Sequence, residues 1–575
     1  MANNDVKNYV SDVFDINDYK EKIIFLYAGV GSGKNVYFDS LADKMPILMV
    51  TSRVAKVHQT LHKYTILDDE RSIERYIDSI YERGNRYDTN IAIAEKEGRY
   101  EYIPEELEDI RTVIPRFGTV YNQSACITYS KFSYFFYKLY DRYGKDFYDS
   151  SVYSVLWNLF KVIVFDEAHS LIMDSMYQNA LFTCSSFIKV FNSKCKLKDR
   201  KLVLMTGTPE SLIELRRRTH GAKTVDLRNK CRSVTPKKIE FISAKDLVKD
   251  VESEYCSGKK IMIFTGKVVN PRTLFKDTNI DLNRVALVCS DEKKLNAYKQ
   301  ESPMAYGLTF YVIGSIEETK RLPVNVDIVV VTNKFYEGID VEGVDDVYIY
   351  AHDATTVKQI SGRFRDGIHT VKIMVDFWEF MYTNEFELEE GKYTLAENQV
   401  SALNKKFNKL HKEERKDIVD RLLDPFCDNK PEEYALEYIR YNVFEKRFEF
   451  YEDRKQYVLY MKSAFMKWYI KNVKGLRRGD MEPDYYKNIV QAWFPNVLVE
   501  QYKSRLYLIR ERIWLAFSNG KIISKKNFDK LVKDLNAIYG DGKTHGIKKF
   551  ISLICADMTI TRIGRKDVYE CKRTK

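Results

Sequence analysis

The segment Lys161-Val-Ile-Val-Phe-Asp166-Glu167-Ala168-His169 places the strongest constraint on the fold. A run of four apolar residues is typical of a strand buried on both faces of a parallel sheet. Two adjacent carboxylates follow it. In open α/β sheets ligands bind beyond the carboxyl ends of the strands, so Asp166 and Glu167 would stand where a bound nucleotide could use them. A strand followed by a solvated acidic turn fits the same residues, and the rest of the chain must separate the two interpretations.

A glycine-rich turn follows the first apolar run of the chain. Residues 23–27 predict a buried strand, and Ala28-Gly29-Val30-Gly31-Ser32-Gly33-Lys34-Asn35 comes directly after it. Such a loop can curl its backbone N–H groups around phosphate oxygens while its lysine reaches the terminal phosphates. Asn35 stands where a hydroxyl usually faces Mg²⁺, and its amide oxygen could substitute. The nucleotide-binding candidates are Gly29, Gly31, Ser32, Gly33, Lys34 and Asn35; a glycine-rich turn without a ligand is the alternative.

Other apolar runs in this part of the chain also end in polar turns. Arg53 follows the run at 46–50, and it could hold a nucleic-acid phosphate or belong to a helix cap. Thr128 ends the run at 125–128 in another loop that could contact a strand of nucleic acid. Thr206 and Thr208 end the run from Lys201, where their hydroxyls could hydrogen-bond the acidic pair. Charged and tyrosine-rich residues predict a helical insertion at about 61–120.

A second alternating pattern begins near residue 237 and predicts another parallel sheet. Its strand candidates are Ile261–Phe264, Val285–Val288, Asp327–Val331, Val347–Tyr350 and Val371–Val375. Gly338 and Asp340 follow one of these runs, and Gln359-Ile-Ser-Gly-Arg363-Phe-Arg365 begins a helix after another. Arg363 and Arg365 could neutralise a triphosphate bound across a domain interface. An ordinary pair of surface arginines is the alternative.

Length and cysteine usage bound the class of protein. A chain of 575 residues exceeds what one core supports, so several domains are expected. Nine cysteines without any Cys-x-x-Cys pair argue against a zinc module or a disulfide scaffold and fit a reducing cytoplasm. No apolar run is long enough to span a bilayer and no signal pattern begins the chain, so we expect a soluble, cytoplasmic protein without a membrane partner.

The positive charge gathers at the end of the chain. Residues 461–575 hold 25 Lys and Arg against 11 Asp and Glu, whereas residues 1–460 hold 68 against 71. This excess indicates a polyanion partner. Phosphate contacts are expected from a cluster around Trp468, and a second cluster lies near the C-terminus; solvated helix surface is the alternative for each member. The two clusters are Lys462, Lys467, Lys471, Lys474, Arg477 and Arg478, with Trp468 able to stack on a base, then Lys543, Lys548, Lys549, Arg562, Arg565 and Lys566.

Taken in order, these motifs resemble those of helicase superfamily two, in its DEAH-type branch, over residues 20–380. The resemblance implies an α/β fold with two tandem RecA-like parallel-sheet domains, at 1–230 and 231–385. A mainly α-helical, basic C-terminal domain would occupy 386–575. The resemblance also implies ATP and Mg²⁺ as cofactors and nucleic acid as partner.

The same resemblance assigns roles to the candidate residues. Lys34 would bind phosphates, Asp166 and Asn35 would hold Mg²⁺, and Glu167 would act on the attacking water. His169, Thr206 and Thr208 would couple ATP to the nucleic-acid groove, Gly338 and Asp340 would lie near the ribose, and Gln359, Arg363 and Arg365 would face the γ-phosphate. The family motif ends Gly-Arg-x-Gly-Arg, so in Gly362-Arg363-Phe364-Arg365 the last arginine is one position early. Either arginine could be the finger.

The function expected from the sequence is an ATP-dependent DNA helicase or translocase. The short segment before Lys34 is similar to that of compact helicases of phages, viruses and plasmids, which favours a host-cell or cytoplasmic role in replication, recombination or repair with replication proteins as partners. Two alternatives stay open. One is an RNA helicase of the same superfamily, and the other is an origin-binding initiator whose motor is slow or vestigial.

Overall fold

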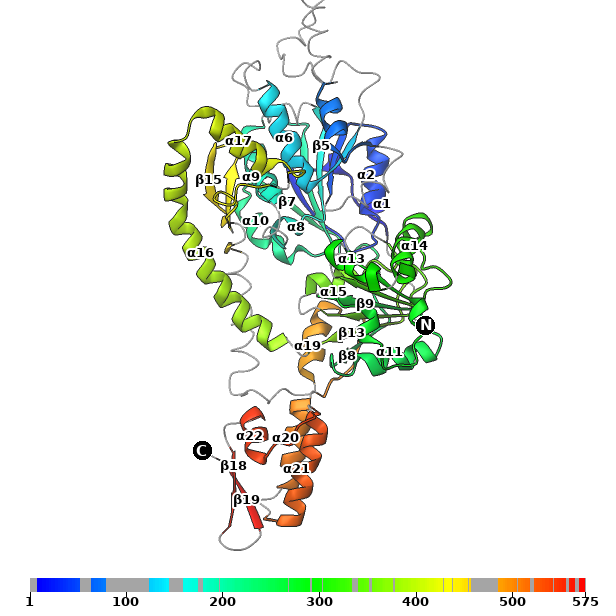
Figure 1. Cartoon of the computed structure of the whole chain (residues 1–575). Coiled ribbons are helices and arrows are strands. Elements are labelled where there is room, and N and C mark those ends of the chain that lie inside the picture. The colour runs from blue at the N-terminus through cyan, green and yellow to red at the C-terminus, as the bar shows by residue number, and fades with distance from the viewer. Residues whose placement is uncertain are drawn as a thin grey trace, which may run out of the picture.

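The computed structural model describes residues 8–51, 64–78, 124–143, 159–173, 179–195, 197–266, 268–289, 292–301, 303–332, 340–350, 354–375, 378–427, 429–436, 438–452, 455–456, 484–503, 505–517, 522–540, 542–554, 558–563 and 568–573. Figure 1 shows two stacked α/β lobes, a helical arm along one side and a small unit at the C-terminal end. Among the described residues, no helix is long and apolar enough to cross a membrane.

The first lobe is built on a seven-stranded, all-parallel sheet in the order β3-β4-β2-β5-β6-β1-β7. Its strands are β1 (Ile23–Tyr27), β2 (Ile47–Thr51), β3 (Thr65–Leu67), β4 (Ala125–Thr128), β5 (Val162–Asp166), β6 (Lys201–Thr206) and β7 (Lys223–Asp226). Its helices are α1 (Val10–Val13), α2 (Lys34–Ala42), α6 (Tyr129–Tyr143), α8 (Ser170–Met173), α9 (Asn179–Lys194) and α10 (Ile213–Arg218).

Alternate residues of the central strands enter two different cores. Ile23, Phe25 and Tyr27 pack into the core on one face of β1, while Ile24 and Leu26 pack into the core on the other. A strand that is covered on both faces must be apolar throughout, which is why these strands read as continuous apolar runs in the sequence.

The second lobe repeats this construction with the sheet order β10-β11-β9-β12-β13-β8-β16, again all parallel. Its strands are β8 (Lys238–Ile242), β9 (Ile261–Thr265), β10 (Val285–Val288), β11 (Ile328–Thr332), β12 (Asp346–Ile349), β13 (Thr370–Met374) and β16 (Leu498–Val499). Its helices are α11 (Leu247–Cys256), α12 (Pro271–Leu274), α13 (Glu292–Glu301), α14 (Pro303–Thr319), α15 (Ala354–Ser361) and α19 (Asp484–Trp493). The two parallel sheets confirm the predicted tandem α/β fold.

Residues 386–575, expected as one domain, contribute to three bodies. The helical arm, α16 (Trp378–Asn408) and α17 (Lys412–Leu423), packs with the hairpin β14 (Ile439–Asn442) and β15 (Arg447–Phe450) into the core of the first lobe. Val490, Phe494 and Val499 instead join the core of the second lobe. Residues 505–573 form a separate unit with its own core. Apolar side chains far along the chain therefore complete both lobes.

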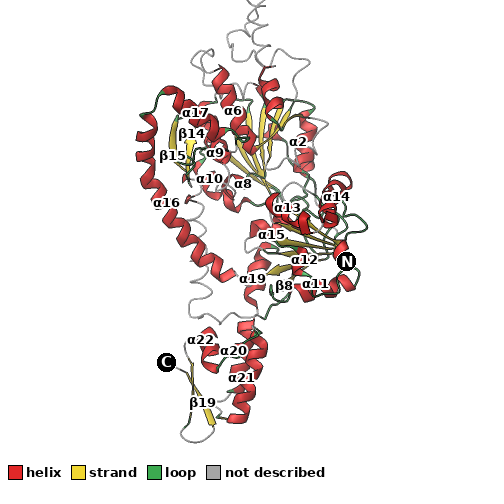
Figure 2. Cartoon of the chain, in the orientation of Figure 1, coloured by secondary structure: helices red, strands yellow, loops and turns green. Residues whose placement is uncertain are grey.

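Two local sequence patterns differ from the structure that they suggest. The acidic stretch at 387–390 would suit a linker, yet it lies inside α16, because glutamate is a strong helix former. Of the helical insertion expected at 61–120, the described part is residues 64–78. It begins with β3 at the edge of the first sheet, and only residues 70–78 are helical (Figure 2). Ile73 and Ile77 of that helix are buried in the core of the first lobe.

Candidate nucleotide site between the lobes

The glycine-rich turn connects β1 to α2 and depends on left-handed backbone. Gly31 and Gly33 have φ angles of 78° and 84°, a region that residues with a Cβ adopt at a cost. Gly31 also lacks room for a side chain, because an added Cβ would lie 2.6 Å from Nη1 of Arg365 and 2.6 Å from Cγ2 of Val234. The loop is therefore pressed against an arginine of the second lobe.

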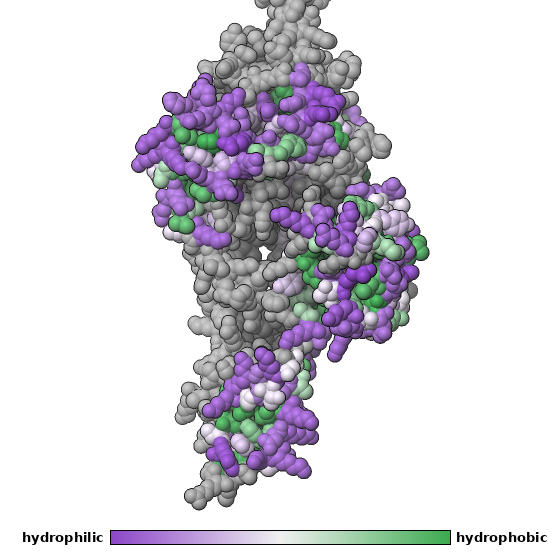
Figure 3. Space-filling view, viewed as in Figure 1, coloured by the Kyte–Doolittle hydropathy of each residue, from purple (hydrophilic) through white to green (hydrophobic). Residues whose placement is uncertain are grey.

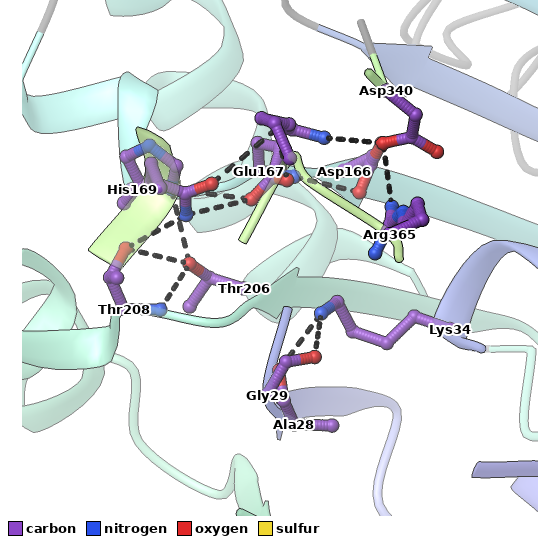
Figure 4. Close-up of polar contacts among 12 residues, drawn as sticks. Ala28, Gly29, Lys34, Asp166, Glu167, His169, Thr206, Thr208, Asp340 and Arg365 are labelled. Carbon is purple, nitrogen blue, oxygen red and sulfur yellow. Dashed lines mark hydrogen bonds and ion pairs between the residues drawn. The ribbon is translucent and has the colours of Figure 1, made fainter. Parts of the chain in front are cut away.

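Lys34 begins α2 and is buried against this loop. Its Nζ donates hydrogen bonds to the carbonyl oxygens of Ala28, at 2.8 Å, and Gly29, at 3.0 Å (Figure 4). Burial lowers the pKa of the Lys34 ammonium to about 8, while the Glu167 carboxylate acts in the opposite direction. A phosphate oxygen would offer this ammonium a charge-assisted bond that is stronger than either carbonyl bond.

Two polar atoms of the loop test whether the site fits a magnesium nucleotide. Oγ of Ser32 and Oδ1 of Asn35 are buried and have no hydrogen-bond partner among the described residues. Buried polar atoms are usually satisfied, so such a pair indicates missing polar neighbours. An amide oxygen and the carboxylate of Asp166 are the hard oxygen ligands that Mg²⁺ prefers. The residues present therefore fit a nucleotide with its magnesium ion.

The acidic turn after β5 turns its second carboxylate toward the second lobe. Glu167 has a φ angle of 51°, a left-handed conformation that is uncommon for a residue with a side chain. Its Oε1 accepts a hydrogen bond from Nη2 of Arg363 at 3.0 Å, and its Oε2 accepts one from Nε2 of Gln359 at 3.3 Å. The side chains of Glu167 and Arg363 are only 7% and 6% exposed, so this ion pair between the lobes is held away from water.

A second chain of hydrogen bonds links β6 to α15 of the other lobe. Nδ1 of His169 lies 3.1 Å from Oγ1 of Thr206, which also accepts the backbone N–H of Thr208 at 3.0 Å. Oγ1 of Thr208 in turn accepts from Nε2 of Gln359 at 3.2 Å. His169 is also 3.6 Å from the Glu167 carboxylate. The predicted coupling residues thus touch both the acidic turn and the second lobe.

The two arginines after α15 occupy different positions. Nη2 of Arg365 lies 2.8 Å from Oδ1 of Asp340, whereas Nη1 of Arg363 is 3.9 Å from the same oxygen (Figure 4). Only Arg363 contacts the acidic turn of the first lobe. Gly362 makes the close approach possible, because a Cβ there would lie 2.4 Å from the side chain of Val30 in the glycine-rich loop.

Some predicted residues lie elsewhere. Thr128 is 2% exposed and its Oγ1 accepts the backbone N–H of Lys131 at 3.4 Å, which caps α6. Outside the described residues are Arg53, Gly338, Lys471, Lys474, Arg477 and Arg478. Of the second basic cluster, Arg565 and Lys566 also lie outside them.

The structure adds contacts that the sequence analysis missed. The Tyr129 hydroxyl donates to the carbonyl oxygen of Asp166 at 2.8 Å and so supports the acidic turn from α6. The backbone N–H of Val234 donates to the carbonyl oxygen of Val30 at 3.0 Å, and the Tyr9 ring covers Gly33. No local pattern marks Tyr129 or Val234. Gly362 could have been noticed, since it lies inside the motif that carries the arginines.

Comparison with known proteins gives structural similarities alone. No protein-family model matches the chain, and no curated protein matches it in sequence. The chain is similar to S. cerevisiae Dbp5 bound to RNA and ADP BeF3, with 14% identity, a TM-score of 0.37 and coverage of 70% of this chain and 90% of that one. It is similar to Mss116p bound to ssRNA and AMP-PNP, with 12% identity, a TM-score of 0.36 and coverage of 62% and 66%. It is also similar to the Mycobacterium smegmatis helicase Lhr bound to ssDNA and AMP-PNP, with 11% identity, a TM-score of 0.34 and coverage of 78% of this chain and 58% of that one.

Proposed function

We propose that this chain is a nucleic-acid-dependent ATPase that works as a helicase or translocase. The observation that supports the proposal most is the buried contact of Glu167 with Arg363 and Gln359. A carboxylate beside a phosphate-binding loop in one lobe meets a cation and an amide from the other lobe. Hydrolysis at such a site depends on how the lobes stand relative to each other, and that dependence is what a motor requires.

ATP, when bound, supplies the phosphoanhydride bond, and Mg²⁺ neutralises part of its charge. In the proposed mechanism the Nζ of Lys34 exchanges the carbonyls of Ala28 and Gly29 for phosphate oxygens. Asp166 and Asn35 hold the metal ion. These groups act before the chemical step and bind the ground state.

The chemical step belongs to the contact between the lobes. Arg363 exchanges its bond to Glu167 for the charge that develops on the transferring phosphoryl group, which frees the carboxylate. Glu167 then orients the attacking water and accepts its proton at Oε1 or Oε2. His169 and Thr206 hold the acidic turn in place. Gln359 connects this turn to the second lobe through its hydrogen bond with Thr208.

The finer assignment is a DEAH-type enzyme that acts on DNA in replication, recombination or repair. The Asp166-Glu167-Ala168-His169 motif supports the branch. The excess of Lys and Arg at 461–575 supports a nucleic-acid partner.

Asn35 favours a second candidate, an origin-binding initiator with a slow motor. The Asn35 amide oxygen stands on a longer side chain than the usual hydroxyl, and Mg²⁺ demands near-ideal octahedral geometry, so a displaced ligand would slow turnover while nucleotide binding is kept. Phosphate release in the presence of single-stranded DNA, duplex DNA, forked DNA and RNA separates the candidates. Strong stimulation by one polymer supports the motor, and slow release with every polymer supports the initiator.

The decisive test compares Glu167→Gln with Lys34→Ala. Glu167→Gln should lower hydrolysis by about 10²-fold or more and leave ATP binding within a few-fold, since the carboxylate acts on water in the transition state. Lys34→Ala should weaken both. The rate of phosphate release measures hydrolysis, and equilibrium binding of a fluorescent ATP analogue measures ATP binding. Turnover near that of the unmodified protein in Glu167→Gln would remove the catalytic assignment.

A further inference from the structure

The C-terminal unit has a topology that the function above does not use. Its elements follow the order α20 (Arg505–Ala516), β17 (Ile523–Ser524), α21 (Lys525–Tyr539), α22 (Ile547–Ile554), β18 (Met558–Arg562) and β19 (Val568–Arg573). The sheet order is β17-β19-β18 with antiparallel pairs, so the first strand lies beside the last. A helix, a short strand, two helices joined by a turn and a final two-stranded ribbon make up a winged helix-turn-helix arrangement.

This unit is a folded body and not an extension of the motor. Its core contains Ile509, Ile513, Phe528, Leu531 and Phe550, all buried among themselves. Figure 1 shows the unit beyond the second lobe, where Nζ of Lys245 lies 5.5 Å from the ring centroid of Tyr539. The unit therefore has its own core and lies apart from the candidate site between the lobes.

Described residues on both sides of position 541 connect the end of α21 to the segment before α22. Gly540 ends α21 with a left-handed φ of 62°. The Asn536 side chain then bridges the turn: its Nδ2 donates to the carbonyl oxygen of His545 at 2.9 Å, and its Oδ1 accepts the backbone N–H of the same residue at 2.6 Å. The Tyr569 ring stacks on Phe528 at 3.7 Å and attaches the ribbon to α21. The orientation of α22 is therefore set before any partner arrives.

Charge and exposure divide α22 into two faces. Phe550 is fully buried in the core and Ile547 and Ile551 pack partly against it, whereas Lys548 and Lys549 are exposed. The whole unit, residues 505–573, contains 16 Lys and Arg against 7 Asp and Glu. Four lysines within α21 are also exposed, at Lys525, Lys526, Lys530 and Lys533. Figure 3 shows hydrophilic residues over part of this C-terminal unit.

We propose that this unit docks on duplex DNA with the exposed face of α22 in the major groove and with lysines of α21 on the flanking phosphates. The major groove of B-form DNA is about 12 Å wide and admits an α-helix, whose diameter with side chains is about 10–12 Å. The deep, narrow major groove of A-form RNA excludes a helix, so duplex RNA is a poor partner. The proposal rests on the proposed function for the role of the bound duplex, while docking itself needs no ATP.

The experiment measures binding of the full chain, without nucleotide, to a fluorescent 20-base-pair DNA duplex, the same duplex in RNA, and single-stranded DNA. Lys548→Glu with Lys549→Glu should weaken binding to duplex DNA at least about tenfold. Lys530→Glu with Lys533→Glu in α21, the helix proposed to contact the phosphates, should make the slope of log affinity against log salt shallower by about 2, at roughly 0.9 for each lost phosphate contact. The matched control, Lys405→Glu with Lys409→Glu, makes the same charge change on exposed residues at the end of α16 and should stay within about twofold.

Thermal melting of each variant controls for folding. A second variant, Lys548→Gln with Lys549→Gln, removes the two charges without reversing them. Its affinity for duplex DNA should lie between those of the unmodified protein and the corresponding glutamate variant. Equal affinities of the α22 variant and the control, or duplex RNA bound as tightly as duplex DNA, would overturn the proposal. Glu167→Gln separates this result from the motor, because it should lose hydrolysis and still bind duplex DNA like the unmodified protein.

Discussion

The two lobes have separate sheets of the same topology, but they contribute different residues to the candidate site. When the strands of each lobe are counted in chain order, both sheets run third, fourth, second, fifth, sixth and first, and a seventh strand lies beside the first. In the first lobe that seventh strand is β7, which comes next in the chain. In the second lobe it is β16, which arrives after the helical arm. The two sheets therefore have the same topology although their last edge strands, β7 and β16, come from different parts of the chain.

The polar residues are distributed unequally over this common frame. The first lobe delivers Lys34, Glu167 and Thr206 from the carboxyl ends of its strands or from the helix that follows. The second lobe delivers Gln359 and Arg363 from α15 and its C-terminal end. Under the proposed mechanism, the first lobe would therefore bind the phosphates and the attacking water, and the second lobe would add positive charge through Arg363. This comparison predicts which substitutions act through contact and which through folding.

The largest expected effect lies in the contact between the lobes. Arg363→Ala should lower hydrolysis by about 10³-fold, the smaller end of the range for an arginine finger. Arg365→Ala should cost at least tenfold less, because Arg365 lies against Gly31 and pairs with Asp340 but does not contact Glu167, the carboxylate proposed to act on the water. Arg363→Lys should stay impaired, since an ammonium lacks the planar fork of a guanidinium. Single-turnover hydrolysis measures the three variants; a larger loss in Arg365→Ala would exchange the roles of the two arginines.

The edge strands offer the next test. Val499 of β16 is 2% exposed and packs into the core of the second lobe, so Val499→Ala should destabilise that lobe by about 1–3 kcal/mol. The neighbouring Leu498 is 64% exposed, and Leu498→Ala should cost less than about 0.5 kcal/mol. Hydrogen exchange of the amides in β8 measures both. If Val499→Ala leaves their protection unchanged, β16 is no structural equivalent of β7.

A smaller effect is expected from pH at the phosphate loop. In the protein without nucleotide, burial lowers the pKa of Lys34 to about 8. A bound polyphosphate would raise this pKa, so above pH 8 the nucleotide-bound protein holds more protons than the nucleotide-free protein. Nucleotide affinity should therefore be level below about pH 8 and fall as pH rises further, by at most about tenfold per unit. Equilibrium binding of ADP from pH 7 to 9.5 measures the profile. Lys34→Arg should flatten it, since a guanidinium keeps its proton; an identical decline in that variant would place the titrating group elsewhere.

The smallest expected effect concerns the metal site. Asn35→Thr should keep or raise ATPase activity, because a hydroxyl suits the tight octahedral shell of Mg²⁺. Asn35→Ala should raise the Mg²⁺ concentration needed for half-maximal activity by about a few-fold. A Mg²⁺ titration of phosphate release compares the three proteins. Unaltered Mg²⁺ dependence in Asn35→Ala would exclude this residue from the metal site.

Strands that are covered on both faces were predicted well. Ten of them, including β5 and β11, fall within one or two residues of their expected positions. Strands β3, β7, β8 and β16 were missed. They lie at or next to the sheet edges, have only two to five residues and include charged ones such as Lys223 and Asp226, so no apolar run marks them.

The sequence by itself determined the two parallel sheets and the chemistry at their edges, because burial on both faces forces apolar runs and the strand ends then carry the polar residues. Only the tertiary structure decided that Arg363, and not Arg365, contacts Glu167. It also decided that residues after 386 divide among both lobes and a separate helix-turn-helix unit. These outcomes depend on contacts between residues far apart in the chain, such as the pairing of Val499 with Ile239. Local sequence patterns do not predict such contacts.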